Sequence, residues 1–210
     1  MAATYVYIDG FNLYYGCVKG TPYKWLDLDA LCDRLLPKDD VVQIRYFTAK
    51  VSARPDDPRA PQRQEIYLRA LATIPKLSVH YGHFLTNRTY LPLVKPPRVG
   101  SRKAHVLKTE EKGSDVNLAA HALLDGFRDR YETAVIISND SDLREPVRMI
   151  RHELGLRVGV INPHPAARRS RELSSDASFF KQMRASVLAG CQFPATLVDA
   201  VGRFSKPKGW

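Results

Sequence analysis

Apolar residues follow two kinds of spacing along the chain, one typical of β-strands and one typical of helices. Short apolar or alternating runs, such as TYVYIDG and TAVIIS, predict β-strands at residues 4–10, 41–51, 77–85, 133–138 and 156–162. Apolar residues at helical spacing predict helices at residues 26–36, 62–74, 114–130 and 141–154. Strands that alternate with helices need crossover connections. The sequence therefore predicts an α/β fold with a mainly parallel sheet of about five strands, covered by helices on both faces.

Two stretches of the chain do not follow this alternation of strands and helices. Residues 87–113 combine a few apolar residues with three prolines, which indicates an extended or hairpin-like insertion. Beyond residue 162 the chain becomes polar and basic, with one further helix predicted at residues 180–191. We therefore divide the chain into a main domain at residues 1–162, which carries the insertion, and a basic helical C-terminal extension at residues 163–210.

Acidic side chains stand where predicted strands end. Asp9 ends the first strand, Asp140 and Asp142 follow the fourth, and Asp115 lies in the first turn of the helix after the insertion. In open α/β sheets, ligands bind beyond the carboxyl ends of the strands. Each aspartate alone could simply cap a helix or favour its N-terminus. Four converging carboxylates would repel one another unless a cation, a basic side chain or raised pKa values offset their charge.

The residue types define the cation that such a cluster would hold. Carboxylate oxygens, without a cysteine or a histidine pair, favour Mg²⁺ or Mn²⁺ over zinc. Such an ion lowers the pKa of a bound water and neutralises charge on phosphate oxygens. The cluster therefore predicts phosphodiester chemistry with one or two metal ions.

The charge balance points to a polyanionic partner. The formal net charge is +10 and the pI is about 9.6, which favours nucleic acid. The insertion contributes a group of basic residues that could neutralise phosphates, namely Arg98, Arg102, Lys103 and Lys108. A solvated loop with ordinary charges is the alternative for this segment.

Cysteine use and hydropathy bear on the compartment. The three cysteines are widely spaced and form no CxxC pair, which argues for a reducing compartment and against a structural zinc site. No apolar run approaches the roughly 20 residues that span a bilayer. The N-terminus leads directly into a predicted strand without a signal-peptide pattern. We therefore expect a cytoplasmic protein with no membrane partner.

Three segments together resemble the signature segments of NYN-domain proteins, which are PIN-like, metal-dependent ribonucleases. They are YVYIDGFNLYYG, KGSDVNLAAHAL and VIISNDSDLREPVRMIR, and RQEIYLRAL resembles the bacterial, functionally uncharacterised branch. The resemblance covers residues 4–162 in the family's order. It implies a three-layer PIN-like (Rossmannoid) fold, with the main domain as the catalytic domain.

The resemblance also assigns roles residue by residue. It implies catalytic and metal-binding roles for the matched acids, Asp9, Asp115, Asp140 and Asp142. Asn12 matches the family's asparagine, which is implied to be catalytic by contacting metal-bound water or phosphate. Lys112 matches the segment's lysine, which is implied to offset carboxylate charge or to contact phosphate. Ser138 and Asn139 match two small polar positions, and we expect all three residues to contact nucleic acid. Many relatives carry glycine at the position of Asn139.

The resulting prediction is an Mg²⁺- or Mn²⁺-dependent endoribonuclease that acts on single-stranded or structured RNA. The main alternative is an RNA- or DNA-binding regulator that keeps the fold and the cation site without turnover. A phosphatase is disfavoured, because its D-x-D nucleophile lies on the first strand, whereas Asp140 and Asp142 follow the fourth. The RNA target and the oligomeric state, including a homodimer, stay open.

Overall fold

The computed structural model describes residues 2–210 as an α/β protein built around a six-stranded sheet. The strands run in the order β3-β2-β1-β6-β7-β8, and each neighbouring pair is parallel. Their bounds are β1 (Ala3–Asp9), β2 (Asp40–Thr48), β3 (Leu77–Tyr81), β6 (Thr133–Ile137), β7 (Arg157–Asn162) and β8 (Phe179–Gln182). The predicted parallel sheet is confirmed, with one strand more than expected.

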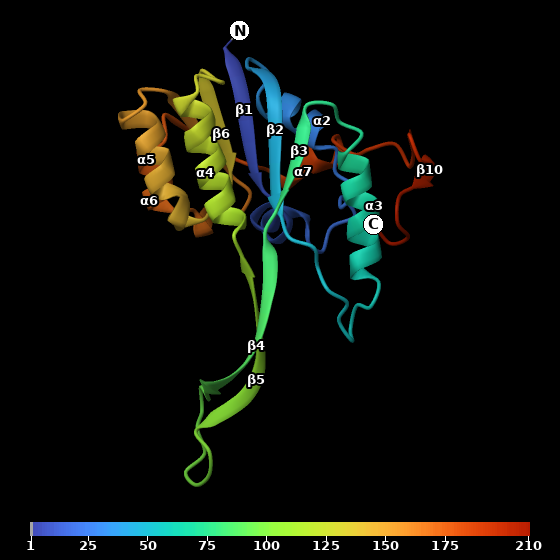
Figure 1. Cartoon of the computed structure of the whole chain (residues 1–210), viewed down its shortest axis with the longest axis vertical. Coiled ribbons are helices and arrows are strands. Elements are labelled where there is room, and N and C mark those ends of the chain that lie inside the picture. Colours follow the sequence, from blue (N-terminus) through green and yellow to red (C-terminus); the bar gives the residue numbers. More distant parts are fainter. Residues whose placement is uncertain (1) are drawn as a thin grey trace.

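Helices cover both faces of the sheet, as predicted (Figure 1). One face carries α4 (Ser114–Phe127), α5 (Arg144–His152) and α6 (Arg171–Asp176). The other carries α1 (Gly10–Leu13), the π-helical turn η1 (Tyr14–Val18), α2 (Leu28–Leu35), α3 (Ala60–Leu71) and α7 (Ala185–Ala189). Side chains of β1 alternate between the two layers: Val6 and Ile8 enter one hydrophobic cluster, and Tyr7 enters the other.

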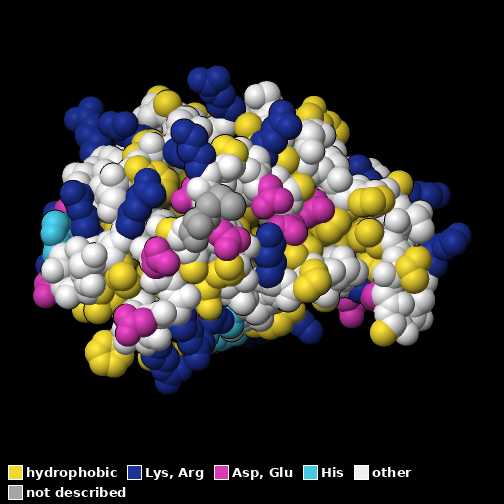
Figure 2. Space-filling model, turned by 90° about the horizontal axis from the view of Figure 1, so that it is seen from above, with side chains coloured by type: hydrophobic (Ala, Val, Ile, Leu, Met, Phe, Trp, Pro, Cys, Tyr) yellow, Lys and Arg dark blue, Asp and Glu magenta, His cyan; other side chains and the backbone are white. Residues whose placement is uncertain are grey.

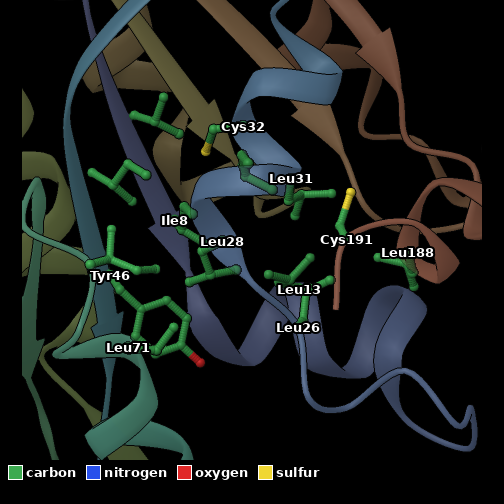
Figure 3. Close-up of a cluster of buried hydrophobic side chains, with 14 of the residues drawn as sticks. Ile8, Leu13, Leu26, Leu28, Leu31, Cys32, Tyr46, Leu71, Leu188 and Cys191 are labelled. Carbon is green, nitrogen blue, oxygen red and sulfur yellow. The ribbon is translucent and has the colours of Figure 1, made fainter. Parts of the chain in front are cut away.

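The larger cluster fixes the helices beside the end of β1 (Figure 3). Leu28 and Leu31 of α2 pack there with Leu71 of α3 and Leu188 of α7, all fully buried. Burying each such side chain contributes roughly 2 kcal/mol. Helix α2 begins at Asp27, whose side chain accepts two amide hydrogen bonds. This cap fixes the start of the helix, and Leu28 and Leu31 then face the sheet.

A two-stranded antiparallel arm, residues 83–112, extends away from the body (Figure 1). It consists of β4 (His83–Pro92) and β5 (Lys103–Lys112). The hairpin-like insertion is therefore present but begins earlier than predicted, because the expected strand at 77–85 is divided at Gly82 into β3 and β4. A Cβ on Gly82 would collide with Glu111 and with the backbone of Lys112, so the base of the arm requires glycine.

The helix predicted at residues 180–191 is wrong. Residues 179–182 form β8, which extends the sheet beyond β7, and only α7 is helical. The aromatic ring of Phe179 packs over Gly159, where any Cβ would overlap it. The sheet thus continues past residue 162, the boundary expected from the sequence, and the basic extension is only partly helical.

The rest of the chain consists of short elements. The 3₁₀ turns η2 (Ser141–Leu143) and η3 (Ala166–Arg168) follow β6 and β7, and a hairpin of β9 (Thr196–Asp199) and β10 (Gly202–Ser205) lies near the C-terminus. Phe204 of this hairpin packs against the buried Trp25. Within residues 2–210, no helix has the length and apolar character needed to cross a bilayer.

Candidate active site

Asp9 lies at the carboxyl end of β1 and begins α1. Its Oδ1 accepts a hydrogen bond of 2.9 Å from the amide of Asn12, and its Oδ2 accepts one of 3.0 Å from the hydroxyl of Ser138. The residue is only 4% exposed. Burial raises the pKa of the Asp9 carboxyl to about 7, and the charges of Asp115 and Asp140 act in the same direction.

The segment after β6 holds the second group of side chains. The Ser138 hydroxyl, which donates to Asp9, also accepts a hydrogen bond of 3.1 Å from the amide of Asp140. The Asn139 amide donates to Oδ1 of Asn12 at 2.9 Å, which ties this segment to α1. Ser138 has no exposed surface, so its hydroxyl contacts the Asp9 carboxylate and the Asp140 backbone from inside the protein.

The side chains of Asn139 and Asn12 also form hydrogen bonds within the chain. The Asn139 side chain donates to the carbonyl of Arg168 and accepts from the amide of Ser170, at 2.8 and 2.9 Å. These two bonds hold the loop after β7 against the end of β6. The sequence predicts Ser138 and Asn139 as contacts for nucleic acid, whereas the contacts of their side chains lie within the chain.

Asp115 reaches the same region from the first turn of α4. Gly113, with φ +96°, lets the chain turn from the arm into this helix, and Glu111 accepts bonds from the amide and hydroxyl of Ser114. Asp115 is half-buried. Burial raises its pKa to about 6, followed in importance by the charge of Asp140 and then of Glu111.

These acids face one cleft of about 330 Å³. Its lining includes four carboxylates, Asp9, Glu111, Asp115 and Asp140. Asp142 is exposed and does not line the cleft, although its charge contributes to the raised pKa of Asp115. The sequence-predicted acids therefore divide into three that face the cleft and one at its margin.

The donor set of the cleft suits a hard divalent cation. Carboxylate oxygens are the ligands that Mg²⁺ and Mn²⁺ prefer, and mutual repulsion among these acids is relieved by positive charge. In the described part of the chain, however, no three His, Cys, Asp or Glu side chains gather closely enough to form a finished metal centre.

The predicted basic residues lie away from the cleft. Lys112, at the base of the arm, is exposed and places Nζ 3.7 Å from Glu110. The other four are exposed on the arm itself, namely Arg98, Arg102, Lys103 and Lys108. Seen at the opposite edge of the sheet, basic side chains stand apart and are interspersed with acidic and apolar ones (Figure 2). The arm extends from the body and carries these exposed basic residues.

Seven further residues of the cleft were not predicted from the sequence, namely Phe11, Tyr15, Val51, Arg54, Phe84, Glu111 and His164. Arg54, Phe84, Glu111 and His164 carried no signal in the sequence, since loops and the arm bring them to the cleft. Burial and the charge of Arg168 lower the pKa of His164. The ring of Phe84 meets Phe11 edge-on at 5.7 Å, which joins the arm to α1.

Comparison with known proteins identifies the family. The sequence model of the NYN domain matches residues 3–183, nearly the whole chain. The chain belongs to the NYN domain family. The resemblance seen in the sequence is thereby confirmed, and this NYN-domain match includes β8.

Two known proteins are similar to this chain, one in sequence and one in fold. The chain is 34% identical over 235 residues to 6-hydroxy-3-succinoylpyridine 3-monooxygenase HspA of Pseudomonas putida (strain DSM 28022 / S16), covering 99% of this chain and 75% of that protein. It also resembles the crystal structure of VPA0982, a protein of unknown function from Vibrio parahaemolyticus RIMD 2210633. That likeness has a TM-score of 0.57 at 16% identity and covers 87% of this chain and 93% of the other, so it supports the fold alone.

Proposed function

We propose that this NYN-domain protein hydrolyses phosphodiester bonds of RNA with the help of Mg²⁺ or Mn²⁺. One observation carries the proposal: acids from three distant segments face one cleft, and the pKa values of Asp9 and Asp115 are raised there. A carboxyl group with a raised pKa and neighbouring acids is typical of a functional site. The NYN family, which resembles ribonucleases, supplies the reaction class.

Asp9, Asp115 and Asp140 would hold the ion. When bound, it would supply a water of lowered pKa and neutralise charge on the phosphate. Ser138 holds Asp9 and Asp140 in register from inside the protein. Asn12 fixes the segment after β6 by accepting from the amide of Asn139. Asp142 would adjust the charge at the margin of the cleft.

Two other side chains complete the cleft chemically. Arg54 lies at its rim and has no acidic partner within 4 Å in the described residues, so its guanidinium can contact a phosphate oxygen. Burial and the charge of Arg168 lower the pKa of His164, which favours its neutral imidazole, and this ring can accept a hydrogen bond at the cleft wall.

The arm supplies the electrostatic attraction for RNA. Residues 83–112 contain seven Lys or Arg and two Glu, so the arm carries a net charge of +5. That is half of the net charge of +10 of the whole chain. The arm begins at the cleft, because its residues Phe84 and Glu111 line the cleft. An RNA strand that binds along the arm would therefore reach the acidic side chains. Lys112 and the four basic residues further out would neutralise phosphates and release counterions.

The second candidate is oxygenation of a small heteroaromatic compound. It is favoured by the 34% identity to HspA, a protein named for its action on 6-hydroxy-3-succinoylpyridine. The distinguishing assay supplies that compound, a reductant and oxygen, and follows oxygen consumption. A binding regulator without turnover is distinguished by salt-sensitive RNA binding that yields no products.

The test compares three purified proteins on the same RNA with Mn²⁺. The unaltered chain should cleave, and Asp140→Asn should not. Asp40→Asn, at the opposite end of β2, is a matched control in an exposed position and should cleave normally. Cleavage that is equal with Asp140→Asn, or absent from the unaltered chain, would refute the proposal.

A further inference from the structure

A second cavity, also of about 330 Å³, adjoins the acidic cleft. Its walls are rich in aromatic side chains, and we call it the aromatic pocket after Phe11, Tyr14, Tyr15, Tyr46, Tyr67 and Trp210. Four residues line both cavities: Phe11, Tyr15, Val51 and Arg54. The two cavities are therefore neighbouring parts of one surface depression, with Arg54 at their junction.

The walls of the pocket are fixed by internal hydrogen bonds. The Tyr67 hydroxyl donates to the carbonyl of Leu26 at 2.9 Å, and its ring lies 5.7 Å from that of Trp210. Gln64 donates to the carbonyl of Ala49 and accepts from the amide of Val51, each at 2.9 Å. The shape of the pocket is thus largely present before any ligand binds.

Tyr46 links the pocket to the catalytic acids. It comes from β2, and its hydroxyl lies at the border of the hydrophobic cluster (Figure 3). A Cβ on Gly10 would stand 2.6 Å from the Tyr46 ring, so glycine directly after Asp9 is what admits this side chain. The same Asp9–Gly10 step therefore shapes both the acidic cleft and the aromatic pocket.

Four basic side chains and two acidic ones, Asp56 and Asp57, line the pocket, so its charge is net positive. Lys19, Lys24 and Arg54 line it, and among residues 2–210 none of the three has an acidic side chain within 4 Å. Lys19 lies 4.9 Å from the ring centroid of Tyr15. Arg63 differs, because its Nη2 bonds Asp57 at 2.6 Å. Aromatic walls with unpaired cations at the mouth suit a planar ring that carries an anionic group.

We propose that the aromatic pocket holds one unstacked nucleobase of the RNA strand, with the adjoining phosphate in the acidic cleft. This inference rests on the proposed function. A nucleobase stacks on aromatic side chains whatever its identity, and a nucleotide, whose base is linked to a phosphate, can fill both cavities at once. The covalent link between base and phosphate matches the continuity of the two cavities at Arg54. The pocket would therefore select unpaired RNA over duplex RNA.

Tryptophan fluorescence offers a direct test. The chain has two tryptophans; Trp25 is fully buried, so a ligand-induced change reports Trp210. Adenosine 5′-monophosphate, titrated into the full chain, should quench the emission to saturation. Tyr15→Ala should weaken binding about fivefold or more, because it removes an exposed stacking surface. Phe127→Ala, an exposed aromatic on α4, is the matched control and should bind normally.

A second measurement separates this inference from the proposed function. Trp210→Ala should raise the KM for a short single-stranded RNA about fivefold or more, and Asp140→Asn should still bind adenosine 5′-monophosphate. The inference is overturned if the nucleotide does not bind, if both pocket variants behave like Phe127→Ala, or if pyridine-3-carboxylate binds and the nucleotide does not. Failure of the proposed function appears instead as nucleotide binding without any RNA cleavage.

Discussion

The Ser138 hydroxyl lies 3.0 Å from Oδ2 of Asp9, although 129 positions separate the two residues in the chain. Because β1 and β6 are parallel neighbours, the end of one strand meets the segment that leaves the other. The same hydroxyl accepts a hydrogen bond from the amide of Asp140. One buried serine thus sets the distance between acids from two strands.

Ser138→Ala should lower both stability and activity. The change leaves Oδ2 of Asp9 and the amide of Asp140 without their partner, which costs about 1–3 kcal/mol. Urea unfolding measures the loss of stability, and initial rates of RNA cleavage measure the loss of activity. Ser141→Ala, at an exposed neighbouring position, is the control. Unfolding midpoints that are equal for the two variants would contradict the assigned role of Ser138.

Removing divalent ions should make stability fall as pH rises. The pKa of Asp9 is about 7 in the folded protein against an ordinary value of 3.8, so the folded state binds more protons between those values. Ionised Asp9 therefore lowers the free energy of unfolding by on the order of 4 kcal/mol. This loss is absent below about pH 4 and complete above about pH 7. Thermal unfolding in EDTA across this range measures the slope.

Two comparisons test the origin of that slope. Mn²⁺ should stabilise the protein more at pH 8 than at pH 5, because the carboxylates that bind it are then ionised. Asp9→Asn should flatten the slope and stabilise the ion-free protein at pH 8, since its amide can still accept from Asn12 and donate to Ser138. An unchanged slope in Asp9→Asn would assign the effect to other groups.

Local patterns in the sequence predicted the sheet well and its edges poorly. Buried strands such as β1 and β6 are apolar on both faces, so their runs are visible in the sequence. The strand β8 escaped prediction because four residues with helical neighbours carry too little periodicity, and only its pairing with β7 defines it. The break at Gly82 depends on a clash with Glu111, which lies far along the chain.

The same distinction holds for the candidate site. Asp9, Asp115 and Asp140 could be predicted because each follows a strand or begins a helix, and topology brings such positions together. Arg54 comes from an irregular loop, and Trp210 reaches the aromatic pocket only through tertiary packing against Tyr67. Their places depend on contacts that no local pattern encodes.

Charge removal on the arm should weaken RNA binding without unfolding the protein. The combined change of Arg98, Arg102, Lys103 and Lys108 to alanine removes exposed charges that project from the body. The dependence of log K on log salt concentration should flatten by up to roughly 0.7 for each lost phosphate contact. Fluorescence anisotropy of a labelled single-stranded RNA at several salt concentrations measures this slope.

The matched control removes four basic residues from elsewhere, at the opposite edge of the sheet. Arg34, Lys38, Arg128 and Arg157 lie near the ends of α2 and α4 or at the start of β7. Their change to alanine gives the same net charge but should leave the salt slope steeper than the arm variant does. Equal slopes would mean that net charge, and not the arm, attracts RNA.

His80 should make the fold sensitive to mild acid. Burial, followed by the neighbouring His121 and Arg45, lowers its pKa to about 4 from 6.5. The unfolded chain therefore binds a proton that the folded chain excludes, and the contribution of His80 to stability is lost as pH falls from 6.5 to 4, opposite in sign to that of Asp9. With partial exposure the loss is about 1 kcal/mol. Urea unfolding should show a smaller loss of stability between pH 6.5 and 4 in His80→Gln. The control His83→Gln, on the exposed arm, should keep the full loss.

Asp140 and Asp142 look equivalent in the sequence but should differ in function. Asp140 lines the cleft beside Asp9, whereas Asp142 is exposed and reaches the site only through its charge. Asp140→Asn removes a carboxylate from the proposed ion site and should reduce cleavage at least about 100-fold. Asp142→Asn should reduce it less than about tenfold, and raising the Mn²⁺ concentration should restore most of that loss. Both variants keep an oxygen acceptor at their positions, so the comparison separates charge at the cleft from charge at its margin. If the two variants lose activity equally, Asp142 turns into the cleft when the ion binds, and the asymmetry seen here does not describe the active form.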